Sequence, residues 1–291
     1  AFGDSAVLKP ILKKDPFQIE ELGMHPQQIW QIRKNLLSSH GLIVISGPAG
    51  SGKTATLHSL LSLFNKTSLK IVCIDNFPET PFSGRVHVRV QSSQVDPSPL
   101  NQETGLQTCL TMDPDVIALS DLDEHTAAGA LRLSLSGRLI IMTMNANSAL
   151  EAVQRLSELG ISREMLISNL RLVISQRLVP ALCEKCKEKV DPAAYVKILN
   201  MPESDYQGKD FFRAKGCSVC SLTGSSGRTG CFELLELTES LKKVLVNKDP
   251  MMIRKVAVRE GMTTLSTAAF LKCTAGKISI EEFVKIAFDL S

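Results

Sequence analysis

The stretch GPAGSGKTAT, residues 47–56, decides how this 291-residue sequence is interpreted. It contains the full Walker A pattern, from Gly47 through Gly52 and Lys53 to Thr54. The pattern lies between an apolar segment that predicts a strand, GLIVIS, and a segment that predicts a helix, TATLHSLL. Glycines let the backbone N–H groups of such a loop turn inward around phosphates, and the helix N-terminus adds positive potential. The stretch therefore predicts a nucleotide-binding loop; a chance Gly/Ser loop is the alternative.

The residue types in this loop predict separate roles. We expect Lys53 to reach the β- and γ-phosphates and the Thr54 hydroxyl to ligate Mg²⁺. The motif alone does not distinguish ATP from GTP. The predicted nucleotide-binding residues are Gly47, Pro48, Ala49, Gly50, Ser51, Gly52, Lys53, Thr54 and Ala55.

An acidic partner for this loop is expected at the end of a neighbouring strand. Val116–Leu119 is an apolar run that predicts a strand, and Asp121 follows it closely. A carboxylate at that place can hold Mg²⁺ or its water, or orient the attacking water. The alternative is an acid that favours a helix N-terminus, which fits Asp123 and Glu124 better than Asp121.

The order of predicted elements indicates an α/β fold. Short apolar strands alternate with amphipathic helices from Asp15 to about Val179, which predicts a mostly parallel sheet with helices on both faces. The composition changes after Ala181, and residues 183–231 are rich in Cys, Lys, Gly and Ser. The stretch that follows, FELLELTESLKKVLVN (residues 232–247), is interpreted as the first of four short C-terminal helices. We expect a linker at 1–16, a P-loop domain at 17–180, a cysteine-rich subdomain at 181–231 and a helical subdomain at 232–291.

Composition limits the classes of protein. Charge is nearly balanced, with 33 basic and 30 acidic residues, and no basic–aromatic patch indicates nucleic-acid binding. The longest apolar runs have strand length, below the roughly 20 residues that span a bilayer, and no signal peptide opens the sequence. These features predict a cytoplasmic protein that does not bind nucleic acid or span a membrane but could dock on a membrane complex.

Four of the eight cysteines form two CxxC pairs. Cys183 and Cys186 precede Cys217 and Cys220 by about 30 residues. Two thiolate pairs at this spacing predict a structural Zn²⁺ site, in which four protein ligands leave no open position for catalysis. The alternatives are two reduced pairs without metal, or a redox pair. No functional role is predicted for Cys73, Cys109 and Cys231, which are expected to be buried core thiols.

Several stretches together resemble the ATPases of type II secretion and type IV pilus assembly, typified by general secretion pathway protein E. They occur in family order over about residues 7–235 and more weakly to the end. The resemblance rests on ELGM (21–24), HGLIVISGPAGSGKTATLHSLL (40–61), IDNFPE (74–79), QVDP (94–97), MDPDVIALSDLDE (112–124), GRLIIMTMNANSA (137–149), QRLSELGI (154–161), SQRLVPALCEKC (175–186), GCSVC (216–220) and GRTGCFELL (227–235).

The resemblance implies a RecA-like P-loop ATPase with a Cys₄ zinc-binding insertion, a C-terminal all-α subdomain and the cofactors ATP, Mg²⁺ and Zn²⁺. Such motors are usually homo-hexamers that couple ATP hydrolysis to pseudopilus or pilus assembly and protein export at the bacterial inner membrane. Their partners are inner-membrane platform and cytoplasmic-domain proteins of the machinery. Family members carry a further domain upstream, so residues 1–16 are expected to end it. The tetracysteine favours assembly or secretion over pilus retraction.

The sequence departs from the family at catalytic positions. The glutamate of the family's Walker B motif is replaced by Asp121, and the acidic "Asp box" reads DNFPE, from Asp75 to Glu79. We still assign catalytic roles to Asp121, Asp75 and Glu79. Further replacements change the charge at the site: the two family arginines before this strand are the uncharged Gln107 and Thr111, and the two His-box histidines are Arg138 and Asn145.

These departures predict tight nucleotide binding with slow hydrolysis. An arginine that stabilises the transferring phosphoryl group can contribute about 10³–10⁵ in rate. A carboxylate displaced by near 1 Å can cost on the order of 10². Arg138, Arg155, Arg177 or an upstream domain could compensate. Two hypotheses remain: a slow motor ATPase, or a regulatory or scaffolding pseudo-ATPase of the same machinery.

Overall fold

The computed structural model describes residues 16–64, 69–75, 86–89, 102–120, 129–130, 133–158, 162–245 and 249–289. The strands of the main sheet are β1 (Gly41–Ser46), β2 (Ile71–Asp75), β3 (Val86–Arg89), β4 (Val116–Leu119), β5 (Leu139–Met144), β6 (Leu170–Leu182) and β9 (Ser225–Glu236), and a two-stranded sheet is formed by β7 (Glu188–Lys189) and β8 (Phe212–Arg213). Short 3₁₀ turns are η1 (Ile19–Leu22) and η2 (Ser218–Cys220). The α-helices are α1 (Pro26–Leu36), α2 (Lys53–Ser62), α3 (Gln102–Thr111), α5 (Ala149–Glu158), α6 (Arg163–Asn169), α7 (Ala193–Ile198), α8 (Glu203–Tyr206), α9 (Glu239–Leu245), α10 (Pro250–Arg259), α11 (Leu265–Thr274) and α12 (Ile280–Asp289).

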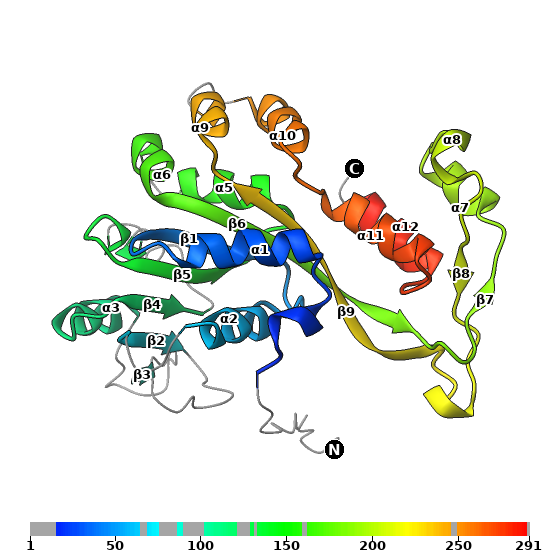
Figure 1. Cartoon of the computed structure of the whole chain (residues 1–291), viewed down its shortest axis with the longest axis horizontal. Helices are drawn as coiled ribbons and strands as arrows, with labels where there is room; N and C mark the ends of the chain where they lie inside the picture. The colour runs from blue at the N-terminus through cyan, green and yellow to red at the C-terminus, as the bar shows by residue number, and fades with distance from the viewer. Residues whose placement is uncertain are drawn as a thin grey trace, which may run out of the picture.

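The main sheet has the strand order β3-β2-β4-β5-β1-β6-β9 (Figure 1). Every neighbouring pair from β3 to β6 is parallel, and β9 closes the edge antiparallel to β6. The predicted mostly parallel α/β sheet is confirmed. Because β1, β4, β5 and β6 run parallel, their carboxyl ends point to the same side of the sheet.

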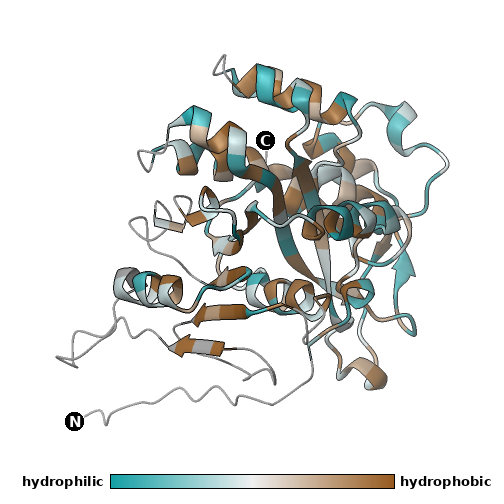
Figure 2. Ribbon diagram, turned by 60° about the vertical axis from the view of Figure 1, so that its left-hand side comes forward, coloured by the Kyte–Doolittle hydropathy of each residue, from teal (hydrophilic) through white to brown (hydrophobic). Residues whose placement is uncertain are grey.

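Two hydrophobic cores lie on the two faces of this sheet. Leu42 and Val44 of β1 face a core shared with α3, α5, α6, α9 and α10. Ile43 and Ile45 of the same strand face a core shared with η1, α1 and α2. A strand buried on both faces reads as a continuous apolar run, which is why GLIVIS predicted a buried strand. Figure 2 shows the hydrophobic residues concentrated along these strands.

A third core joins the long ends of β6 and β9 to the C-terminal helices. It contains Val179 and Cys231 from the two strands, Leu265 from α11 and Phe283 from α12. It also contains Phe211 from the cysteine-rich lobe, which is formed by residues 183–224 between β6 and β9. Figure 1 shows α11 and α12 beside this lobe, away from the main body of the sheet. The predicted division into four parts stays a prediction, although the C-terminal helices and the cysteine-rich lobe are both present.

One predicted element is wrong in part. We expected residues 232–247 to form a helix, yet Phe232–Glu236 belongs to β9, and only α9 beyond it is helical. The apolar spacing of FELLEL fits either element, and pairing with β6 decides between them: Phe232 lies opposite Gln176 and Glu236 opposite Leu172.

Among the helices of the described ranges, none is both long and apolar enough to cross a membrane. The buried thiols predicted for Cys73, Cys109 and Cys231 are confirmed, with exposed fractions of 6%, 0% and 0%.

Candidate functional site

The Walker A loop leaves the carboxyl end of β1 and leads directly into α2. Gly52 is the residue before the helix and adopts the left-handed conformation, with φ 87° and ψ 19°, which glycine reaches without steric cost. Gly47 packs against β6: a Cβ there would stand 2.6 Å from the carbonyl oxygen of Gln176 and 2.4 Å from Ser51 Oγ. The first and last glycines of the motif are therefore required by the shape of the loop.

Lys53 turns back into this loop. Its side chain is buried, and its Nζ donates to the carbonyl oxygens of Gly47 at 3.0 Å and Pro48 at 3.1 Å. The same Nζ donates to Asn145 Oδ1 at 2.9 Å, just after β5. The ammonium group is thus placed within the curve of the loop and is connected to the neighbouring strand.

Gln176 of β6 holds the other side of the loop. It is 2% exposed, and its Nε2 donates to the backbone carbonyl of Ser51 at 2.7 Å. Within the described part of the chain, Gln176 Oε1 and Ser51 Oγ are buried without a hydrogen-bond partner. Leaving such atoms unpaired costs about 1–3 kcal/mol each. The Ser51 hydroxyl can donate to an oxygen atom of a ligand, whereas Gln176 Oε1 can only accept a hydrogen bond.

The turn between β5 and α5 brings further polar groups to the same edge of the sheet. Asn147 Oδ1 accepts from Arg177 Nη2 at 3.2 Å, and the Asn147 N–H donates to Glu151 Oε2 at 2.7 Å. Arg177 is half-buried, and the loss of hydration lowers the pKa of its guanidinium. Its Nη1 has no hydrogen-bond partner among the residues that the structure describes. Of the three arginines considered as replacements, Arg177 is linked to the turn that holds Lys53.

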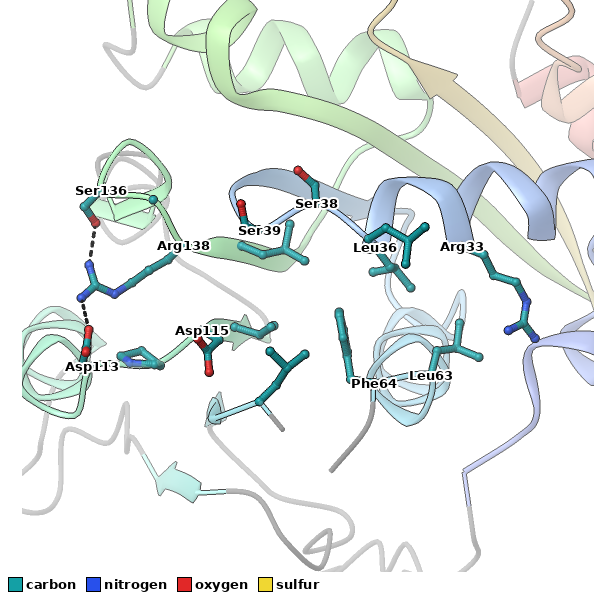
Figure 3. A pocket seen from close by; sticks show the side chains of 16 residues that line it. Arg33, Leu36, Ser38, Ser39, Leu63, Phe64, Asp113, Asp115, Ser136 and Arg138 are labelled. Atoms are coloured by element: carbon teal, nitrogen blue, oxygen red, sulfur yellow. Dashed lines mark hydrogen bonds and ion pairs between the residues drawn. The ribbon is translucent and has the colours of Figure 1, made fainter. Parts of the chain in front are cut away.

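The other two arginines make different contacts. Arg155 pairs with Glu151 on the surface of α5, Nη2 to Oε1 at 2.8 Å. Arg138 precedes β5, at the edge of the sheet opposite the Walker A loop, and its Nη2 pairs with Asp113 Oδ1 at 2.8 Å. It borders a pocket of about 600 Å³ between the end of α1 and the start of β4. Figure 3 shows the Arg138 guanidinium directed to Asp113 and Ser136. Arg138 therefore does not face the Walker A loop of its own chain.

The predicted acidic residues fall largely outside the described part of the chain. Asp121 and Glu79 lie there entirely, as does the side chain of Asp75. Ser120, just before Asp121, is buried and its N–H donates to the Ile74 carbonyl at 3.2 Å. The ends of β4 and β2 are therefore adjacent. The roles predicted for these three acids stay predictions.

Sequence analysis missed Gln176 as part of the site, and it treated Asn145 only as a lost histidine. Gln176 was difficult to find because its contact with Ser51 depends on the parallel pairing of β1 with β6. A polar residue inside an apolar strand segment, LVISQRLV, was the available signal. For Asn145 the signal was its place directly after a strand next to β1.

The four predicted metal ligands come together. The sulfur atoms of Cys183, Cys186, Cys217 and Cys220 all lie within 4.8 Å of one another. Cys220 Sγ is 3.8 Å from Cys186 Sγ and 3.7 Å from Cys217 Sγ. Four thiolates about 2.3 Å from a tetrahedral Zn²⁺ would be separated by about 3.8 Å, which the two separations from Cys220 Sγ match.

Backbone N–H groups favour the thiolate of Cys220, whereas burial raises the pKa of the Cys186 thiol to about 11. The N–H groups of Cys217 and Gly224 each donate to Cys220 Sγ at 3.2 Å. These bonds, that of Cys217 above all, lower the pKa of Cys220 to about 6. A thiolate is the form of cysteine that binds metal.

Comparison with known proteins agrees with this geometry. The family model described as "Type II/IV secretion system protein" matches residues 1–285. The type IV pilus assembly ATPase PilB of Thermus thermophilus is 32% identical over 287 residues, covering 97% of this chain and 32% of PilB. The type II secretion system protein E of Klebsiella pneumoniae is 30% identical, covering 98% of this chain and 56% of that protein. The chain thus spans roughly a third to a little over half of these relatives.

Among solved structures, the pilus retraction motor PilT with bound ADP superposes with a TM-score of 0.67 at 21% identity. The match covers 94% of this chain and 68% of the PilT chain, and it shows a shared fold. With a family model matched over nearly its whole length, the chain belongs to the Type II/IV secretion system ATPase family.

Proposed function

We propose that this chain binds Mg²⁺–ATP at residues 47–55 and acts as an ATPase motor subunit of a bacterial type II secretion or type IV pilus assembly machinery. The observation that carries the proposal is the placement of Lys53. Its ammonium group lies inside a glycine loop, bonded to Gly47, Pro48 and Asn145. A cation held in this way at a helix N-terminus attracts a polyphosphate.

In this proposal the β- and γ-phosphates lie over the loop and replace or join the contacts of Lys53. Thr54, one residue into α2, ligates Mg²⁺ through its hydroxyl. Asp121 holds the ion or its water, and Asp75 and Glu79 complete the acidic side of the site. Gln176 fixes the position of the loop, since its amide bonds the Ser51 carbonyl.

The cysteine cluster is proposed to hold one structural Zn²⁺. Four protein ligands would fill a tetrahedral coordination sphere, so the metal would stabilise the lobe and take no part in hydrolysis. By resemblance to the assembly ATPases, the chain would work as a homo-hexamer. It would act at the cytoplasmic side of the inner membrane, with platform proteins of the machinery as partners.

A second candidate function is a nucleotide-binding pseudo-ATPase that regulates or scaffolds the same machinery. Gln107 and Thr111, which replace two family arginines, are uncharged and exposed on α3. Arg138 does not face the Walker A loop of its own chain, as its pairing with Asp113 indicates. These features support slow turnover with intact binding.

Steady-state ATP hydrolysis separates the two candidates, because a slow motor has measurable turnover that depends on Lys53 and a pseudo-ATPase has essentially none. We expect turnover well below about 1 s⁻¹, the lower end of ordinary enzyme rates. Substituting Asp121→Glu together with Gln107→Arg and Thr111→Arg restores the family residues, and we expect the combined variant to hydrolyse ATP faster than the parent. A parent that already exceeds about 1 s⁻¹ would exclude the pseudo-ATPase and the slow motor alike. Filter binding to single-stranded DNA, expected to be negative, tests the remaining class of nucleic-acid motor.

A further inference from the structure

Glu233 is a buried acid in the middle of β9 that bonds two helices at once. It is 6% exposed. Its Oε1 accepts the N–H of Ala149, the first residue of α5, at 2.9 Å. Its Oε2 accepts the N–H of Leu265, the first residue of α11, at 3.1 Å. One carboxylate therefore satisfies the amino ends of two helices that are 116 residues apart in the sequence, from Ala149 to Leu265.

This arrangement makes each helix depend on the other. A helix N-terminus carries unpaired N–H groups and positive potential, so an anion there is stabilising. Two N-termini directed at one point would repel each other without the carboxylate between them. Neither helix can move away from Glu233 without leaving a buried N–H or carboxylate oxygen unpaired, which is costly.

The α5 side of this bridge leads to the Walker A loop. Only the turn 145–148 separates β5 from α5. That turn begins with Asn145, whose Oδ1 accepts from Lys53 Nζ at 2.9 Å. A phosphate that draws Lys53 toward itself changes the contact between Lys53 and Asn145. Asn145 begins the turn that ends at Ala149, whose N–H donates to Glu233.

The α11 side leads to the rest of the molecule. Leu265 and Cys273 of α11 lie in the third core, against Phe211 of the cysteine-rich lobe. Near the end of the same helix, Lys272 Nζ donates to the Gly23 carbonyl at 2.7 Å, next to η1. Helix α11 thus contacts both the cysteine-rich lobe and the N-terminal segment of the described chain.

We propose that Glu233 is a positioning residue that couples occupancy of the Walker A loop to α11 and through it to the C-terminal helices. This inference rests on the proposed nucleotide binding. It adds a structural link between the Walker A loop and the C-terminal helices α11 and α12. Coupling is reciprocal, so a change in α11 would alter nucleotide affinity by the same factor. Typical couplings correspond to about 5–150-fold.

Hydrogen–deuterium exchange on the whole chain tests this coupling, with Mg²⁺ and a nonhydrolysable ATP analogue. In the parent we expect the analogue to slow exchange in peptides covering the Walker A loop, the start of α5 and the start of α11. In Glu233→Gln the loop peptide stays protected, while the protection of α11 falls by about fivefold or more. Glu236→Gln is the matched control on the same strand: its carboxylate bonds Lys34 Nζ at 2.9 Å on α1, and its exchange pattern should match the parent.

Ala149→Pro provides a second variant in case Glu233→Gln does not fold. Proline is favoured at the first position of a helix and removes the N–H that Glu233 accepts on the α5 side, although its ring must fit where Ala149 is fully buried. This variant should also remove the nucleotide-dependent protection of α11 from exchange. If α11 keeps its nucleotide-dependent protection in either folded variant, the coupling role is wrong. If the parent protects the loop but not α11, the coupling is also wrong while nucleotide binding stands. If the loop itself is unprotected in the parent, the proposed function fails and the coupling with it.

Discussion

Asn145 is the position that the resemblance to the secretion ATPases matches to a family histidine, and in this chain its amide oxygen accepts a hydrogen bond from Lys53 Nζ. The substitution therefore exchanges an ionisable ring for a neutral acceptor. A neutral acceptor orients Lys53 without competing for its charge, so the lysine remains available to phosphate. At the scale of single residues, this contact supports the proposed nucleotide binding.

Removing this acceptor should weaken nucleotide binding moderately. In Asn145→Ala, Lys53 keeps the Gly47 and Pro48 carbonyls but loses its contact with β5. We expect the analogue to bind about tenfold more weakly, because the ammonium group loses a contact that orients it toward the phosphates before they bind. Fluorescence titration with a labelled ATP analogue measures this. Asn200→Ala, a surface residue in the cysteine-rich lobe, should bind like the parent.

Local signals account for what the sequence predicted about the site. The Walker A residues are contiguous, and their flanking strand and helix follow from short apolar patterns that need no distant partner. Glu233 and Gln176 could not be assigned in this way. Glu233 acts through α5 and α11, whose first residues lie 84 positions before and 32 positions after it. Only the assembled sheet brings these groups together.

At the scale of elements, β6 and β9 connect the three cores of the molecule. Their pairing runs from Leu172 opposite Glu236 to Leu182 opposite Ser225, and it leads from the Walker A loop to the cysteine-rich lobe. The same pairing explains why FELLEL is a strand: its alternate residues Phe232 and Leu234 face one core while Leu235 faces another. A helix would bury only one of these faces.

The metal-binding lobe should depend on its ion. We expect about one zinc per chain, and Cys183→Ser should abolish it and destabilise residues 181–231. Bound ligand stabilises a fold by about 4 kcal/mol when its free concentration is a thousand times Kd. Metal analysis and thermal unfolding with and without chelator measure the effect. Cys231→Ser changes an equally buried cysteine outside the cluster and should retain the metal. Full metal content in Cys183→Ser, or none in the parent purified without chelator, would refute the site.

At the scale of the whole molecule, buried thiols should make stability fall at alkaline pH. Burial raises the pKa of Cys231 to about 11 and that of Cys273 to about 12, from an ordinary value of 9.0. The unfolded chain therefore loses these protons first. The thiols contribute their full stabilisation below pH 9, and this contribution is lost as pH rises toward 11 and beyond.

Urea unfolding between pH 8 and 10.5 checks this dependence. Each pKa unit corresponds to about 1.4 kcal/mol, and the window ends below the raised pKa, so Cys231 alone should contribute about 2 kcal/mol to the fall. Cys231→Ala is less stable at every pH because it leaves a cavity, but its free energy of unfolding should decline less steeply. An identical slope in parent and variant would show that the thiol ionises as easily in the folded state as in the unfolded chain.

The central claim is that residues 47–55 form a functional nucleotide site around Lys53. Isothermal calorimetry with Mg²⁺ and a nonhydrolysable ATP analogue tests it most directly, on the parent, on Lys53→Ala and on Lys285→Ala, an exposed lysine of α12 paired with Glu282. We expect one site per chain in the parent and in Lys285→Ala. In folded Lys53→Ala we expect affinity at least about 100-fold weaker, because about two charge-assisted bonds to the nucleotide are lost. Equal affinity in the parent and Lys53→Ala, or no binding by the parent, would contradict it.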